Sequence, residues 1–181
     1  KLSNDTPAQI LSDKPKKYIF IGDSYAARTN SWITEVKSIM GLENNTNCWS
    51  SSSDGAGFTA GTTFKSQLDT LIGTLTAAQK KEITDVVILG GWNDGSTKVT
   101  TALSNLLSSA KQALENAKFH LGYISWEDSR ITEQNKLARV TGCENYIEAA
   151  GANGIAYIGN IEFVMHDYDN FGTDGIHPNS N

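Results

Sequence analysis

Short apolar runs alternate with segments of helical spacing along the whole chain, and this alternation constrains the fold more than any other feature. The run Asp-Val-Val-Ile-Leu-Gly at 85–90 is the strongest strand signal, because it is β-branched and apolar on both faces. The other strands are expected at 17–21, 46–50, 119–124 and 155–158. Helices are expected between the strands, at 26–40, 62–75, 103–117 and 137–150.

This rhythm predicts an α/β fold with a five-stranded parallel sheet and helices on both of its faces. A chain of 181 residues is long enough for one domain with a substantial core. We expect that domain at 15–181, preceded by a polar segment or linker at 1–14. Ligands bind at the carboxyl ends of the strands in such sheets, so motifs that follow the strands carry the most weight.

Charge and hydropathy exclude several classes of partner. The net charge of −5 provides no basic surface for nucleic acid or anionic lipid. No apolar stretch approaches the roughly 20 residues of a membrane span. The polar start at Lys1 indicates that the chain can be part of a larger multidomain protein, and a secreted or cell-surface location is favoured.

The helix expected at 137–150 carries one of the two cysteines. Cys48 and Cys143 are too far apart in sequence for a disulfide framework or a zinc motif, so Cys143 is expected to be a buried free thiol. Gly151 suits the C-cap of this helix. The residues that we expect on its core-facing side are Leu137, Val140, Cys143, Ile147 and Ala150.

A serine follows the first predicted strand directly. Ser24 stands in Gly-Asp-Ser between a strand end and a helix start, where a hydroxyl can lie clear of the sheet and face backbone N–H groups. Such a serine is a candidate nucleophile if the chain supplies a base and an oxyanion site.

The chain has three histidines, and one of them is a suitable base. His177 follows Asp174 by three residues, so the carboxylate can hold the imidazole in the useful tautomer. His120 lies within a predicted strand, where a hydrogen-bonded core histidine is the expected role, and His166 lies in a loop. Asn93, beside glycines after the strand at 85–90, offers an amide donor for an oxyanion.

Four segments together resemble the conserved blocks of the SGNH (GDSL-type) hydrolases. The resemblance extends from Lys17 to Pro178, nearly the whole chain. The blocks are Gly22-Asp23-Ser24-Tyr25, Ser53-Asp54-Gly55-Ala56-Gly57-Phe58, Gly91-Trp92-Asn93-Asp94 and Asp174-Gly175-Ile176-His177.

The resemblance implies a three-layer α/β/α sandwich of flavodoxin-like type and a serine esterase without metal or cofactor. Ser24 would be the nucleophile, His177 the general base and then acid, and Asp174 the residue that orients His177. The oxyanion hole would consist of the Ser24 N–H, the Asn93 side chain and the N–H of Gly55, with Gly57 as second choice. Tyr25 stands where the family motif usually has Leu, and such domains usually continue past this chain's last residue into a final helix.

Two metal sites that the sequence suggests are not favoured. Residues 167–172 are similar to a calcium loop, but Phe171 occupies a ligand position. Asp23, Asp94 and His177 lack the further histidines of common zinc sites.

Aromatic residues near the strand ends indicate the substrate class. Tyr25, Trp92 and Trp126 are expected to contact substrate, whereas Trp49 is expected to cap the core. We therefore expect an acylated glycan or small molecule as substrate, with removal of O-acetyl groups from a carbohydrate as the first hypothesis. The alternatives are a lipase or lysophospholipase-like esterase, and a catalytically idle carbohydrate-binding domain of the same fold.

Overall fold

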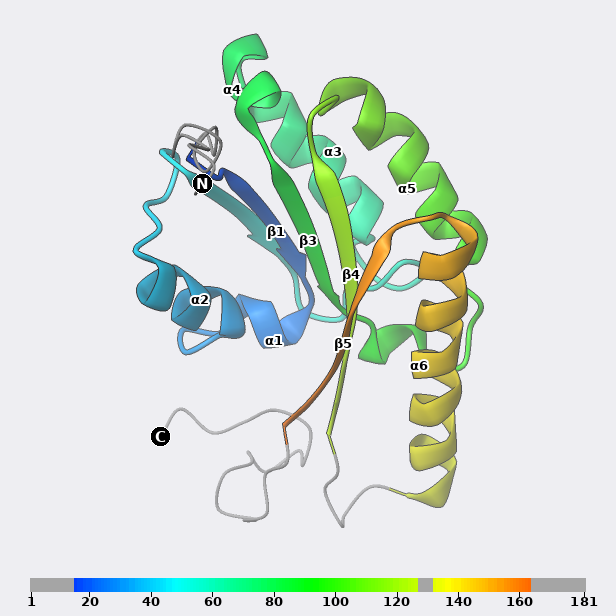
Figure 1. Ribbon diagram of the computed structural model, residues 1–181. Coiled ribbons are helices and arrows are strands. Elements are labelled where there is room, and N and C mark those ends of the chain that lie inside the picture. The colour runs from blue at the N-terminus through cyan, green and yellow to red at the C-terminus, as the bar shows by residue number, and fades with distance from the viewer. Residues whose placement is uncertain (1–14, 127–131, 164–181) are drawn as a thin grey trace, which may run out of the picture.

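The computed structural model describes residues 15–126 and 132–163, and for 125–126 and 160–163 it describes the backbone alone (Figure 1). Five parallel strands form one sheet in the order β2-β1-β3-β4-β5. This confirms the predicted five-stranded parallel sheet. The strands are β1 Tyr18–Gly22, β2 Cys48–Ser52, β3 Asp85–Gly90, β4 Lys118–Trp126 and β5 Ala156–Phe163.

The strand order places a topological switch point between β1 and β3. These two strands are hydrogen-bonded neighbours, with Tyr18 opposite Asp85 and Gly22 opposite Leu89. After β1 the chain moves outward to β2, and after β3 it moves outward in the other direction. In sheets of this order, ligands bind in the crevice beyond the carboxyl ends of the two strands at the switch.

Helices cover both faces of the sheet and give a three-layer α/β/α sandwich (Figure 1). One face carries α1 and α2, and the other carries α3, α5 and α6 (Figure 1). None of the helices in the described ranges is long and apolar enough to cross a membrane. The helices are α1 Ser24–Ala27, α2 Trp32–Met40, α3 Phe64–Thr74, α4 Ala77–Glu82, α5 Thr100–Ala113 and α6 Glu133–Ala152, with a 3₁₀ helix, η2, at Trp92–Asp94.

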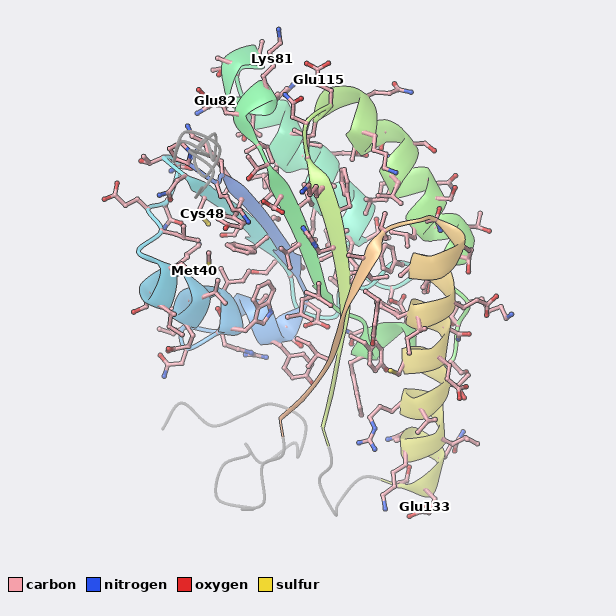
Figure 2. The ribbon with its side chains drawn as sticks, in the orientation of Figure 1. Met40, Cys48, Lys81, Glu82, Glu115 and Glu133 are labelled. Carbon is pink, nitrogen blue, oxygen red and sulfur yellow. The ribbon has the colours of Figure 1, made fainter. Side chains whose placement is uncertain are left out.

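Alternate residues of the buried strands supply two apolar clusters, and side chains fill both spaces between sheet and helices (Figure 2). Ile19 and Ile21 belong to the larger cluster, which includes side chains of α3, α5 and α6. Phe20 points the other way, into a smaller cluster with Ile33 of α2 and the labelled Cys48 (Figure 2). Both faces of β1 are therefore buried, as an apolar run without alternation predicts.

The helix expected at 26–40 is two helices in the structure. Its first part, α1, ends at Ala27, and α2 begins after Ser31, whose side chain accepts a hydrogen bond from the Thr34 N–H at 3.3 Å. This cap stabilises a new helix start and so separates the two helices. The structure also adds α4, which begins with a capping box between Thr76 and Gln79.

The predicted core face of α6 is wrong for most of its residues, and only Ala150 is fully buried as expected. Leu137, Val140 and Ile147 are 68%, 51% and 49% exposed, and Cys143 is only half-buried. The buried residues of α6 are Arg139, Gly142, Asn145, Tyr146, Ala149 and Ala150.

Close packing explains this orientation of α6. A Cβ atom at Gly142 would lie 2.6 Å from both the Gly95 carbonyl oxygen and the Tyr123 hydroxyl, so the helix approaches its neighbours where it has no side chain. The helix also continues past Gly151 to Ala152 and is capped by Asn153, so the predicted C-cap is wrong as well.

Three smaller expectations can be compared with the structure. Trp49 is 5% exposed and part of the core, as predicted. Cys48 and Cys143 are both free thiols. His120 is half-buried, and its Nε2 lies 2.8 Å from Asp85 Oδ1, which agrees with a hydrogen-bonded histidine in the sheet.

The orientation of α6 predicts unequal effects for two leucine truncations. Leu103→Ala removes a fully buried side chain of α5 and should lower the free energy of unfolding by about 2–5 kcal/mol. Leu137→Ala, the same change at an exposed position of α6, should alter it by less than about 0.5 kcal/mol. Urea unfolding of both variants is the measurement, and equal losses would contradict the orientation of α6.

Candidate active site

Ser24 lies at the carboxyl end of β1, beside the switch point between β1 and β3. It is the first residue of α1 and is 6% exposed. The N–H groups of Ala26 and Ala27 donate to the Asp23 carbonyl at 3.0 and 3.1 Å, which closes the single turn of α1. The strand-to-helix turn thus holds the serine at the place where the sequence predicts a nucleophile.

The Asp23 side chain connects the two turns on either side of the switch point. Its Oδ1 accepts the Tyr25 N–H at 3.1 Å, and its Oδ2 accepts the Gly91 N–H after β3 at 3.0 Å. The residue is fully buried. The pKa of this carboxyl is raised to about 7, chiefly by burial and to a smaller extent by the nearby Asp94 carboxylate, while the backbone N–H bonds act in the opposite direction.

The glycine-rich loop, residues 53–61, begins with a tight turn beside the end of β1. The Ser53 N–H donates to the Gly22 carbonyl at 3.4 Å, and the Ala56 N–H donates to the Ser53 carbonyl at 3.2 Å. Gly55 has φ +71° at the third position of this turn, a conformation that glycine adopts without strain. The Gly57 N–H donates to the Ala60 carbonyl at 3.1 Å, which leaves Gly55 as the better oxyanion donor of the two.

Asn93 lies in η2, directly after β3. Its Nδ2 donates to the Ala56 carbonyl at 2.9 Å, so one N–H of the amide is fixed by the glycine-rich loop. A primary amide has a second N–H. The bond to Ala56 uses one N–H of the amide, and the second is the candidate donor for a ligand.

Asp94, the next residue of η2, is the main anchor of the glycine-rich loop. Its Oδ2 accepts the Phe58 N–H at 2.9 Å and the Tyr146 hydroxyl at 2.6 Å. Its Oδ1 accepts both the N–H and the hydroxyl of Thr59 at 2.8 Å. A Cβ atom at Gly57 would lie 2.7 Å from Asp94 Oδ1, so only glycine lets the carboxylate approach this closely.

The expected substrate-binding aromatics differ in exposure. Tyr25 is 5% exposed, so little of its ring is accessible to a substrate. Trp92 is half-buried in η2, beside Asn93. The backbone of Trp126 ends β4, and its side chain lies outside the described atoms. Substrate contact by these three residues stays a prediction.

The expected base and its partner lie outside the described residues. His177 and Asp174, and also His166, fall in the range 164–181. Within 15–126 and 132–163, no group of three or more His, Cys, Asp or Glu residues could hold a metal ion. The described residues place a serine, an oriented amide and a glycine turn near the carboxyl ends of β1 and β3, and their role as an oxyanion site stays a prediction.

Sequence patterns did not identify the residues that hold this arrangement. Asp23 and Asp94 stand inside the motifs, but their partners lie far away in sequence, at separations of 35 to 68 residues for Thr59, Phe58, Tyr146 and Gly91. An acid beside a candidate site residue is the one signal that could have indicated them. Tyr146 has no local signal at all.

No protein-family model matches the sequence, and no curated protein matches it. Solved structures do match. A carbohydrate esterase of family 2 with a carbohydrate-binding domain, from Myceliophthora fergusii, is 16% identical with a TM-score of 0.64, over 92% of this chain and 61% of that one. A member of the lipolytic G-D-S-L family from Veillonella parvula is 16% identical with a TM-score of 0.59, over 91% of this chain and 90% of that one.

An acetyl xylan esterase from the rumen bacterium Butyrivibrio proteoclasticus is 14% identical with a TM-score of 0.54, over 90% of this chain and 59% of that one. The chain has the fold of these proteins. This confirms the flavodoxin-like α/β/α sandwich that the resemblance to SGNH hydrolases implies. The chain spans about three fifths of the length of the two carbohydrate-active esterases.

The raised pKa of Asp23 predicts how stability changes with pH. Below about pH 4 the carboxyl is protonated in both the folded and the unfolded state, so it contributes nothing. As pH rises from about 4 to about 7, the unfolded chain releases this proton while the folded protein retains it. The contribution of Asp23 to the free energy of unfolding therefore falls over this window, by a few kcal/mol, and is constant above it.

Asp23→Asn removes this titration. We expect the stability of the variant relative to wild type to rise between pH 4 and pH 7, although its single acceptor oxygen weakens one of the two N–H bonds. Urea unfolding of both proteins across this range measures the difference, and the other titrating groups cancel. A difference that stays constant with pH would contradict the raised pKa.

Proposed function

We propose that this protein is a serine esterase that hydrolyses acyl esters with Ser24 as the nucleophile. The observation that carries the proposal is the position of Ser24 at the carboxyl end of β1, next to the switch point, with Asn93 after the neighbouring strand β3 and its amide oriented by Ala56. The fold shared with esterases and a lipolytic protein supports it.

The mechanism assigns each motif residue one role. The Ser24 hydroxyl attacks the ester carbonyl while His177 takes its proton, and Asp174 orients His177. The Ser24 and Gly55 N–H groups and the Asn93 side chain stabilise the oxyanion of the tetrahedral intermediate. The alcohol leaves with the proton from His177. Water then attacks the acyl-enzyme while His177 takes its proton, and the Ser24 oxygen leaves with that proton to release the acid.

The substrate that we propose is an O-acetylated carbohydrate. The names of two structural neighbours, an acetyl xylan esterase and a family 2 carbohydrate esterase, support this choice. Trp92, half-buried beside Asn93, offers a ring face that could stack on a sugar. The domain would cover 15–181, after a linker at 1–14, within a larger protein.

The lipolytic neighbour supports the second candidate, a lipase or lysophospholipase-like esterase. Acyl chain length separates the two candidates. Glycan deacetylation predicts a higher kcat/KM for acetyl than for octanoyl esters of the same chromogenic alcohol, and a strong preference for octanoyl would favour the lipase.

Ser24→Ala should abolish turnover of a chromogenic acetyl ester, because no hydroxyl remains to form the acyl-enzyme. We expect kcat to fall by about 10⁴-fold or more, as when the nucleophile of a catalytic triad is removed. Ser108→Ala, at an exposed position of α5, is the matched control and should retain wild-type turnover.

Two outcomes would reject the esterase. One is equal turnover by wild type and Ser24→Ala. The other is a well-folded wild type that hydrolyses neither acetyl nor octanoyl esters, the result that the idle carbohydrate-binding domain predicts.

A further inference from the structure

A tyrosine of α6 contacts the candidate site through Asp94. Tyr146 of α6 is fully buried, and its hydroxyl donates to Asp94 Oδ2 at 2.6 Å, across 52 residues of sequence. Burial raises the pKa of this phenol well above its ordinary value, and the adjacent Asp94 carboxylate adds to the effect. The hydroxyl therefore stays protonated at neutral pH and can donate to Asp94.

Asp94 and Asn93 hold the same short stretch of the glycine-rich loop. The Asp94 carboxylate accepts the N–H groups of Phe58 and Thr59, while the Asn93 amide donates to the carbonyl of Ala56. These bonds form a closed ring between η2 and residues 56–59. Because the ring includes the Asn93 amide itself, a shift of Asp94 changes where the second N–H of that amide points.

The Tyr146 hydroxyl limits the freedom of the Asp94 side chain. Without it, Oδ2 would keep a single donor, the Phe58 N–H. The ring of Tyr146 contacts the same region, because its centroid lies 5.5 Å from that of Phe58. A Cβ atom at Gly91 would lie 2.4 Å from the Tyr146 ring, so the tyrosine also packs against the turn whose N–H binds Asp23.

We propose that Tyr146 is a positioning residue of the oxyanion site: its hydroxyl fixes Asp94, and through Asp94 it orients the Asn93 amide and the turn that presents Gly55. The inference rests on the proposed esterase function. Tyr146 itself touches neither substrate nor reacting atoms in this account. Its effect should therefore appear in the transition state, where the oxyanion forms, and not in substrate binding.

Tyr146→Phe tests the proposal because it removes the hydroxyl and keeps the ring. We expect kcat for an acetyl ester to fall by about tenfold, less than the 10²–10³ loss that follows removal of an oxyanion donor, with KM changed less than twofold. A purely structural role would lower the melting temperature and leave kcat of the folded protein unchanged.

Tyr123→Phe is the matched control. Tyr123 is as buried as Tyr146, and their ring centroids are 5.1 Å apart, but among the described residues its hydroxyl has no hydrogen-bond partner. Loss of the Tyr123 hydroxyl should leave kcat unchanged.

Thr59→Val is a second variant for the case that Tyr146→Phe does not fold. It removes the other hydroxyl donor of Asp94 from an exposed residue and should lower kcat in the same way.

Amide hydrogen exchange gives a readout that does not depend on activity. The N–H groups of Phe58 and Thr59 should exchange faster in Tyr146→Phe than in wild type, and should not change in Tyr123→Phe. An active wild type with unchanged kcat in Tyr146→Phe, or with an equal loss in Tyr123→Phe, overturns the positioning role alone. A folded wild type without ester turnover overturns the proposed function and this inference with it. Unchanged exchange at both N–H groups in Tyr146→Phe would show that the Tyr146 hydroxyl does not hold Asp94 and the loop in place.

Discussion

The Asp23 carboxylate joins the two strand ends between which the candidate site lies, and the rest of the site depends on this connection. It accepts one N–H from the turn after β1 and one from the turn after β3. The bonds fix Ser24 on one side of the switch point relative to Asn93 on the other. The carboxyl group is fully buried, and its pKa rises to about 7. Buried carboxyl groups with a strongly shifted pKa are common at functional sites of proteins.

A second buried carboxylate, Asp94, performs the corresponding task for the glycine-rich loop. The Asp94 side chain accepts four hydrogen bonds, and the Asp23 side chain accepts two. One of the four donors to Asp94 is the Tyr146 hydroxyl of α6. The two acids therefore hold different parts of the site. Asp23 links the turns that follow β1 and β3, and Asp94 holds the glycine-rich loop against η2. The proposed oxyanion donors, which are two backbone N–H groups and one amide, need no charge of their own but depend on both carboxylates for their geometry.

The sequence allowed the strands and the motif positions to be predicted, because a strand covered on both faces appears as an unbroken apolar run, as in β1 and β3. The orientation of α6 could not be predicted from its apolar residues. Its buried side includes the small residues Gly142 and Ala149, which allow close approach to β4 and η2, and Tyr146, whose hydroxyl reaches Asp94. Leu137 and Val140 therefore remain exposed despite their helical spacing. The contacts of Asp23 and Asp94 join distant segments, which no local pattern reveals.

The central claim is that Ser24 is an acyl nucleophile, and its covalent labelling tests this most directly. An activated phosphonate ester transfers its phosphonyl group to a nucleophilic serine and mimics the tetrahedral intermediate. After incubation with wild type, intact-mass spectrometry should show one added phosphonyl group, and peptide mapping should place it on Ser24. Asn93→Ala should react more slowly, because it lacks an oxyanion donor. A protein that stays unlabelled, or that carries the group on another residue, would contradict the account.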